Sequence, residues 1–281
     1  DEVVSIYGAD GSGAQAVHGL YEILAPQIED QGCHSLLYDI EIPLAKVLAD
    51  MELVGFKIDV DGICGYGEEL AVTADALKSR IYMLAGQEFN INSPKQLGEV
   101  LFEKMGLPFS KKTKTGYSTD AETLQKLLPK HEIIGEILEY RHIVKLKSTY
   151  ADGLAKAVAE DGRIHSAFNQ TGTATGRLSS AEPNLQNIPV RTELGRRFRK
   201  YFVPENQDYV LIDADYSQIE LRLLAHIAGD ETMRNAFING HDIHAATAAT
   251  VFGVDIENVT PELRKRAKAV NFGIVYGIGE Y

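Results

Sequence analysis

The sequence predicts an α+β fold in which helices dominate and strands are few and short. Apolar residues recur at helical spacing through long segments, of which 68–84 and 133–150 are the clearest. Two shorter segments, 162–170 and 210–215, have the composition of strands. The 281 residues are enough for one large domain or for several subdomains, each with its own core.

The composition predicts a cytosolic protein without a membrane segment. No apolar run approaches membrane-spanning length, and Cys33 and Cys64 form no metal-binding pattern, which indicates reduced thiols. A net charge of −12 argues against a nucleic-acid binder, but the basic residues gather in three clusters, 111–114, 191–200 and 264–268. Basic tracks on an acidic body suit an enzyme that binds DNA and moves along it.

The first third of the chain predicts a separate N-terminal piece followed by helices. Residues 1–33 combine a short strand pattern with a helical one, and a further helix opens near residue 39. Asp39-Ile40-Glu41 superficially matches the Asp-x-Glu of a metal-dependent exonuclease, but it opens a helix and does not end a strand. We therefore interpret these carboxylates as structural. Residues 55–60 end that helix and begin the next unit.

A basic segment separates two groups of helices between residues 93 and 150. Ser93 and Pro94 predict the N-cap and first position of a helix that runs to about Met105. Residues 111–119 lack periodicity and predict an exposed loop, which precedes helices over 122–128 and 133–150. A solvated loop explains Lys111, Lys112 and Lys114 without any ligand. Contact with nucleic-acid phosphates is the functional alternative, and it would carry no sequence information.

Polar and small residues follow the strand predicted over 162–170. Residues 171–180 contain too few apolar side chains for a core strand. Glycines and small hydroxyl side chains let a backbone approach a partner closely, and Arg177 adds a planar fork of donors. Three amides come next, for which turn formation is the structural alternative to ligand contact: Asn184, Gln186 and Asn187.

Residues 260–277 predict a helix with two contrasting faces. Thr260 is a good N-cap and Pro261 suits the first helical position. At about 100° per residue, one slowly drifting stripe holds two cations and then two rings, Arg264, Lys268, Phe272 and Tyr276. The opposite side is apolar and is expected to face a core, with Leu263, Ala267, Val270 and Ile274.

The order of side chains on the stripe suggests a ligand. Successive turns are about 6 Å apart along the axis, so two cations can hold neighbouring phosphates while a ring one turn further stacks on a base or sugar. The stripe therefore predicts a nucleoside triphosphate lying along the helix. A solvated basic face with two packed aromatics is the simpler structural alternative.

Residues 210–215 predict a strand that ends in carboxylates, followed by a helix. Hard cations such as Mg²⁺ require oxygen ligands, so Asp215 at the strand tip is the first candidate metal ligand. Asp213 lies on the same strand face but is not assigned. Ser217 and Glu220 match a capping box, which would explain that glutamate structurally.

Two motifs together are highly specific: Asp215-Tyr216-Ser217-Gln218-Ile219-Glu220-Leu221-Arg222, and about forty residues later Arg264-x3-Lys268-x3-Phe272-x3-Tyr276-Gly277. The combination resembles motifs A and B of the family A DNA polymerases, the DNA polymerase I type. From about Leu36 onward, most of the chain looks like the polymerase domain of that family. The resemblance implies a right-hand architecture with a helical thumb, an antiparallel-sheet palm that is incomplete here, and the start of helical fingers.

The resemblance also implies domain divisions. The expected divisions are 1–33 for the end of an exonuclease-like domain, 34–57 for a linker helix and palm base, 58–157 for the thumb, 158–225 for the palm, and 226–281 for part of the fingers.

The activity implied by the resemblance is template-directed addition of deoxynucleotides to a primer 3′-hydroxyl in DNA replication or repair. Two Mg²⁺ ions would support this phosphoryl transfer, with Asp215 and the Tyr216 carbonyl among their ligands. The nucleotide-binding residues would be Arg191, Gln218, Glu220, His244, Arg264, Lys268 and Phe272. Lys268 is the best candidate to protonate the leaving pyrophosphate, and Glu220 would exclude a 2′-hydroxyl beneath the sugar.

The implied partners are primer–template DNA and deoxynucleoside triphosphates. By resemblance, Arg177 would contact minor-groove acceptors at the primer end, and Tyr276 would lie against the templating position. The other DNA contacts would be Asn184, Gln186, Asn187, Lys111, Lys112 and Lys114. We expect a monomer in the bacterial cytoplasm, associated with the nucleoid.

The sequence departs from the family in one respect. It contains no His-Asp-Glu segment, which supplies the second metal-binding carboxylate. We therefore expect that this polypeptide alone is a fragment that does not polymerise. One alternative is a non-catalytic DNA-binding module derived from such a polymerase. Another is a relative of single-subunit RNA polymerases, which Glu220 and Phe272 disfavour.

Overall fold

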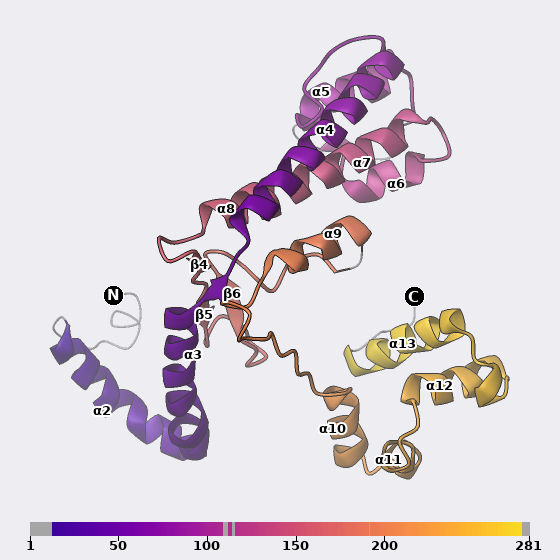
Figure 1. Cartoon of the computed structure of the whole chain (residues 1–281). Helices are drawn as coiled ribbons and strands as arrows, with labels where there is room; N and C mark the ends of the chain where they lie inside the picture. The colour runs from indigo at the N-terminus through magenta and orange to yellow at the C-terminus, as the bar shows by residue number, and fades with distance from the viewer. Residues whose placement is uncertain (1–12, 109–111, 114–115, 191, 277–281) are drawn as a thin grey trace. The chain divides into compact units, whose positions relative to one another are not determined.

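The computed structural model describes residues 13–108, 112–113, 116–190 and 192–276 (Figure 1). Helices dominate and the strands are short and antiparallel, as the sequence predicted. The chain divides into two compact units, Asp1–Leu211 and Ile212–Tyr281, and each is described by itself.

The first unit opens with helices that lead into a short strand. These are α2 (Ala14–Asp30), a π-helical turn η1 (Leu36–Glu41), α3 (Ile42–Val54) and β1 (Phe56–Lys57). Residues 39–41 lie within the helical turn, as predicted. Gly55 ends α3 with a φ of 60°, and a Cβ there would lie 2.7 Å from the Ile164 carbonyl oxygen. Only glycine lets the chain turn this closely against its neighbour.

The helix α4 (Val60–Ala85) is 26 residues long and is the longest described helix of the first unit. Asp59 caps it by accepting a hydrogen bond from the Gly62 amide at 2.9 Å, so the helix begins earlier than its apolar periodicity predicted. It packs along α7 (Ile133–Lys145), which continues through a π-helical turn η3 (Leu146–Ala151) into α8 (Asp152–Lys156) (Figure 1).

The apolar residues of the first unit gather in two clusters. One lies around the start of α4 and the end of α7, with Ile63, Tyr66, Leu70, Ile143, Leu146, Leu154 and Phe198. The other lies at the far end of the same two helices, with Ile81, Leu97, Leu101, Leu124, Ile133, Ile134 and Ile137.

Several short elements lie between α4 and α7 in the sequence and pack near the end of α4 and the start of α7. These are α5 (Pro94–Gly98), a π-helical turn η2 (Glu99–Lys104), β2 (Lys112–Thr113), β3 (Gly116–Tyr117) and α6 (Ala121–Leu127). Ser93 caps α5 as predicted, accepting from the Gln96 amide at 3.4 Å.

The exposed loop predicted over 111–119 is wrong for its described residues. They form a β-hairpin, and Ser118 and Thr119 are buried. The reason is a side chain elsewhere: the Arg141 guanidinium donates to the Thr119 carbonyl and hydroxyl oxygens.

The strand predicted over 162–170 is broken into two. β4 (Arg163–Ile164) pairs with β1, and β5 (Ala167–Asn169) pairs with β6 (Ser179–Ala181). The break falls where the buried Ser166 hydroxyl turns toward the Ser180 hydroxyl, 2.6 Å, and the Pro183 carbonyl oxygen, 2.8 Å. Beyond β6, α9 (Glu193–Arg197) and a 3₁₀ turn η4 (Phe198–Tyr201) complete the unit.

His165, at the same break, ties α3 to the strands. Its Nδ1 lies 2.6 Å from the Glu52 carbonyl oxygen and its Nε2 lies 3.0 Å from Asp161 Oδ2. Both partners only accept hydrogen bonds, so the protonated ring satisfies both and the neutral ring only one. The Glu52 carbonyl and the Asp161 carboxylate accordingly raise the pKa of His165.

We expect the stabilising effect of His165 to depend on pH. Because the folded-state pKa is raised, the effect is complete below the ordinary value of 6.5 and is lost as pH rises through the raised value. Urea unfolding of the chain and of His165→Gln from pH 5 to pH 9 checks this. The difference in unfolding free energy should shrink as pH rises, and a difference that stays constant would contradict it.

The strand predicted over 210–215 does not form. Residues 210–216 form no strand, and Val210 and Ile212 are 77% and 85% exposed. A strand exists only where its backbone N–H and C=O groups meet a partner, and none of the described strands pairs with this segment. The strand predicted over 210–215 is therefore wrong for the described structure.

The rest of the second unit is helical (Figure 1). It consists of α10 (Ile219–Ile227), α11 (Glu231–Ile238), α12 (Ile243–Phe252), a 3₁₀ turn η5 (Ile256–Asn258) and α13 (Pro261–Tyr276). Thr260 caps α13 as predicted, accepting from the Leu263 amide at 3.3 Å. The capping box predicted at Ser217 and Glu220 does not form, because Gln218 occupies the N-cap of α10 and no side chain caps this helix.

The face that α13 packs against α12 differs from the prediction. Val270, expected to face a core, is 41% exposed, whereas Ala267 is fully buried. Arg264 and Asn271 lie beside Ala267 on the helix and hydrogen-bond to α12. Polar pairs and two small residues, Ala267 and Ala248, therefore join these helices in place of an apolar seam.

Candidate functional site

Asp242 organises the polar contact between α12 and α13. Its Oδ1 accepts from the backbone amides of His244, 2.9 Å, and Ala245, 3.2 Å, which caps α12. Its Oδ2 accepts from Arg264 Nε at 2.6 Å. Burial alone would raise the pKa of Asp242, but the Arg264 guanidinium and the two amides lower it below its ordinary value. Asp242 is therefore ionised at neutral pH and fixes Arg264 in place.

The two cations predicted on α13 lie on successive turns of the helix. The side chain of Arg264 is 42% exposed, and its ion pair with Asp242 uses Nε, the nitrogen nearest the helix. Lys268 is exposed one turn further on. The aromatic half of the stripe cannot be described in the same way, because the side chains of Phe272 and Tyr276 lie outside the described residues.

His244 is buried between the same two helices, at 2% exposure. Its Nδ1 lies 3.0 Å from Asn271 Nδ2, which also donates to the Thr247 hydroxyl at 3.1 Å. Burial lowers the pKa of His244; Asp242 opposes this, and the charges of Arg264 and Lys268 lower it further. The imidazole is therefore neutral at pH 7, and Asp242, His244, Arg264 and Lys268 form one electrostatically coupled group.

The segment before α10 presents its candidate residues to solvent. Asp215 is exposed and Tyr216 is 80% exposed. Gln218 takes a left-handed conformation, φ 55° and ψ 42°, which costs a residue other than glycine about 1 kcal/mol. Its buried Oε1 has no hydrogen-bond partner among the described residues. Glu220 lies half-buried in the first turn of α10.

The loop between β5 and β6 carries Arg177 on an exposed turn. A Cβ at Gly172 would lie 2.8 Å from the Ser179 hydroxyl, so glycine is needed for the loop to fold onto its own base. The Thr173 hydroxyl donates to the Arg177 carbonyl oxygen at 2.7 Å. The small residues thus shape the turn that presents the guanidinium.

Of the three amide side chains that follow, those of Asn184 and Gln186 form hydrogen bonds within the turn, and among the described residues that of Asn187 does not. Asn184 Oδ1 accepts from the Gln186 amide at 3.0 Å, and Gln186 Nε2 donates to the Leu178 carbonyl oxygen at 3.1 Å. Asn184 and Gln186 therefore stabilise the turn, which was the alternative to ligand contact for these residues. The Asn187 backbone carbonyl accepts from the Tyr150 hydroxyl at 2.6 Å, and its side-chain amide makes no hydrogen bond within the described part of the chain.

Several predicted site residues cannot be placed. Arg191, Lys111 and Lys114 lie outside the described residues, and Lys112 is described only as a member of β2. No group of three or more His, Cys, Asp or Glu side chains that could hold a metal ion occurs among the residues that are described.

Arg141 is a candidate that the sequence analysis missed. It lines a polar hollow of about 520 Å³ together with Asn92, Tyr117, Ser118, Thr119 and Asp120. Burial lowers its pKa, and within the described ranges no carboxylate forms an ion pair with it. A half-buried guanidinium beside an open polar hollow can receive an anion. The sequence feature that could have identified Arg141 is its position one turn after Ile137, where a cation interrupts the apolar stripe of the 133–150 helix.

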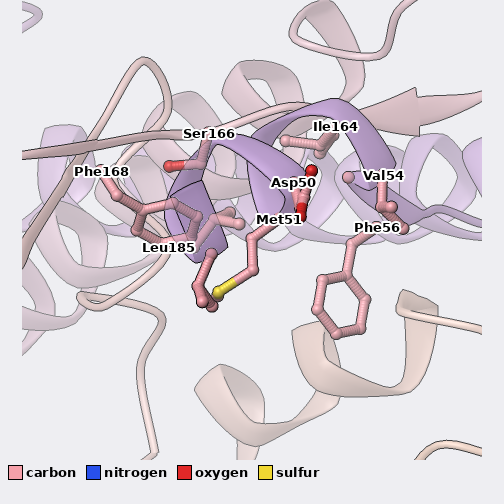
Figure 2. A pocket seen from close by; sticks show the side chains of 10 residues that line it. Asp50, Met51, Val54, Phe56, Ile164, Ser166, Phe168 and Leu185 are labelled. Carbon is pink, nitrogen blue, oxygen red and sulfur yellow. The ribbon is translucent and has the colours of Figure 1, made fainter. Parts of the chain in front are cut away.

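An apolar groove of about 370 Å³ lies in the first unit, between α3 and the strands (Figure 2). Its labelled side chains are Asp50, Met51, Val54, Phe56, Ile164, Ser166, Phe168 and Leu185. None of the predicted site residues lines it, and among the lining residues Asp50 is the one titratable side chain. The lining of the groove therefore carries none of the chemistry predicted from the sequence.

Comparison with known proteins identifies the family. The model of DNA polymerase family A matches residues 62–281. The chain belongs to DNA polymerase family A. It is 57% identical over 263 residues to a DNA polymerase I of Caldicellulosiruptor bescii, and 55% identical over 269 residues to one of Geobacillus stearothermophilus. These matches cover 93% and 95% of the chain but only 31% of each relative.

A solved structure of the family agrees with the fold. The POL domain of Pol1 from M. smegmatis, in complex with DNA primer-template and dNTP, matches with a TM-score of 0.89 and 42% identity. The match covers 100% of this chain and 51% of that one. This family A chain thus corresponds to part of a longer polymerase domain. None of the described helices is both long enough and apolar enough to cross a membrane.

Proposed function

We propose that this family A chain binds primer–template DNA and the incoming deoxynucleoside triphosphate during template-directed DNA synthesis. The observation that carries the proposal is the polar group on α12 and α13, where Asp242 holds Arg264 beside a buried neutral His244 and one turn from Lys268. Two cations and a neutral donor on adjoining turns suit a chain of phosphates.

We assign the chain to the parts of a right hand as the resemblance implied. Residues 58–157, with α4 to α8, would form the thumb, 158–225 the palm and 226–281 the start of the fingers. Residues 1–33 would end an exonuclease-like domain, and 34–57 would link it to the palm. The helices of residues 58–157 and the short antiparallel strands of residues 158–225 support the assignment.

In the proposed site, each residue of α12 and α13 has a separate task. Arg264 and Lys268 hold the triphosphate, and Lys268 also gives a proton to the leaving pyrophosphate. His244 donates to a phosphate oxygen, while Phe272 packs near the new base and sugar and Tyr276 lies at the templating position. Arg191 and Gln218 complete the nucleotide contacts. Glu220, which forms no capping box, lies beneath the sugar and excludes a 2′-hydroxyl.

The proposed metal ligands make an incomplete set. Asp215 and the Tyr216 carbonyl offer the oxygen atoms that Mg²⁺ prefers, but the described residues bring no further acids together with them. This donor set does not fit the two ions that the family resemblance implies. We therefore assign Asp215 and Tyr216 as contributors to a site that the described residues do not complete, and we expect no polymerisation by this chain alone.

The proposed DNA contacts lie in the first unit. Arg177 would contact the minor groove near the primer end, and the free side-chain amide of Asn187 is the best placed of the three amides. Asn184 and Gln186 can still donate through amide hydrogens that their turn bonds do not use. Lys111, Lys112, Lys114 and the half-buried Arg141 would contact backbone phosphates.

A chimeric polymerase tests the proposal. In it, this chain replaces the matching part of the Geobacillus stearothermophilus relative, with which it shares 55% identity over 269 residues. We expect primer extension with deoxynucleotides and little use of ribonucleotides. A chimera that binds primer–template but extends it with neither would favour a non-catalytic DNA-binding module. Preferential use of ribonucleotides would favour a relative of RNA polymerases.

A further inference from the structure

The hydrogen bonds around His244 run in a fixed direction. They begin at the Ile243 carbonyl oxygen, which can only accept and receives the Thr247 hydroxyl hydrogen at 2.9 Å. Since that hydroxyl has only one hydrogen, its contact with Asn271 at 3.1 Å must be one in which it accepts. The atom of Asn271 that faces Thr247 is therefore the amide nitrogen.

The same nitrogen determines the state of the histidine. Asn271 Nδ2 carries two hydrogens, and the second points to His244 Nδ1 at 3.0 Å. A ring nitrogen that accepts a hydrogen bond carries no proton, so the neutral ring of His244 carries its proton on Nε2. The ring of His244 therefore accepts at Nδ1 and can donate only through Nε2–H.

We propose that Asn271 is a positioning residue, which fixes His244 as an Nε2–H donor for a phosphate oxygen of the incoming nucleotide. The inference rests on the proposed function, because it takes the triphosphate as the acceptor. Thr247 is the second member of the device, since it orients the Asn271 amide. Neither residue was predicted from the sequence, although Asn271 precedes Phe272 within the stripe motif.

The state of His244 can be measured without any nucleotide. In the full chain labelled with ¹⁵N-histidine, with His244 assigned through His244→Gln, we expect a protonated Nε2 and an unprotonated Nδ1 at pH 7.5. Asn271→Asp offers only acceptors, so Nδ1 should then carry a proton. Asn258→Asp, an exposed substitution of the same type, should change nothing at His244. An Nδ1–H ring in the unsubstituted chain would overturn the proposal.

Titration with dATP tests the link to the nucleotide. Binding should shift the His244 Nε2 resonance, and Asn271→Leu should weaken dATP binding by about 3- to 10-fold, the usual effect of one hydrogen bond. If Asn271 acts through His244, the same substitution in a His244→Gln background should add almost nothing. Additive losses would indicate a purely structural role and overturn the proposal.

Two failures remain distinguishable. If dATP does not bind, the proposed nucleotide site is wrong, and the ¹⁵N measurement without nucleotide decides the tautomer of His244 separately. If dATP binds and the resonance of His244 Nε2 does not move, nucleotide binding stands and the role given to Asn271 and His244 is wrong.

Discussion

Asp215→Asn in the chimeric polymerase should abolish primer extension while leaving the protein folded. Neutralising one ligand of a catalytic metal removes several kcal/mol of transition-state stabilisation, which corresponds to a loss of about 10³-fold or more in kcat/KM. Single-nucleotide extension under saturating DNA measures the loss. Asp215 is exposed, so its substitution should not alter the unfolding transition.

Asp213 provides a matched control for that experiment. It is the same residue type, two positions earlier in the same exposed segment, and the metal assignment leaves it out. Asp213→Asn should change kcat/KM by less than about 3-fold, the range of an ordinary surface substitution. Equal losses in the two variants would show that the acidity of the segment matters and not a ligand at position 215.

Lys268→Ala should lower kcat/KM in the chimera by about 10²- to 10⁴-fold, because it removes both a phosphate contact and the proposed general acid. Lys268→Arg separates these two tasks. Arginine keeps the charge but holds its proton too tightly to transfer it, so KM for the nucleotide should recover while kcat stays low.

The exposed Lys265 on the same helix is the control for charge alone. Lys265→Ala should leave kcat/KM within about 3-fold of the unsubstituted chimera. If Lys268→Arg restores kcat completely, Lys268 acts as a charge only, and the assignment of proton transfer to this residue is wrong.

Local signals predicted the helices well because their causes lie within a few residues. Ser93 and Thr260 cap the helices that they were predicted to begin. The strand predicted over 210–215 failed because its formation depends on a partner, which no pattern within the segment can supply. The capping box at Ser217 failed for a related reason, since Gln218 adopts a backbone conformation that favours another start of the helix.

The relative positions of the two cations on α13 could be predicted from the sequence, but the residues around them could not. The spacing of Arg264 and Lys268 placed both on one side of α13, as the structure has them. Their environment could not be predicted, because Asp242 and Thr247 come from another helix and become neighbours only after folding. Arg141 was missed because its hollow is lined by Thr119 and other residues that lie 20 or more positions earlier in the sequence.

A crystal structure of the chimera with primer–template and dATP tests the central claim most directly. We expect triphosphate oxygens within about 3 Å of Lys268 Nζ, His244 Nε2 and the terminal nitrogens of Arg264. A triphosphate bound elsewhere, with Arg264 and Lys268 both directed toward solvent, would contradict it.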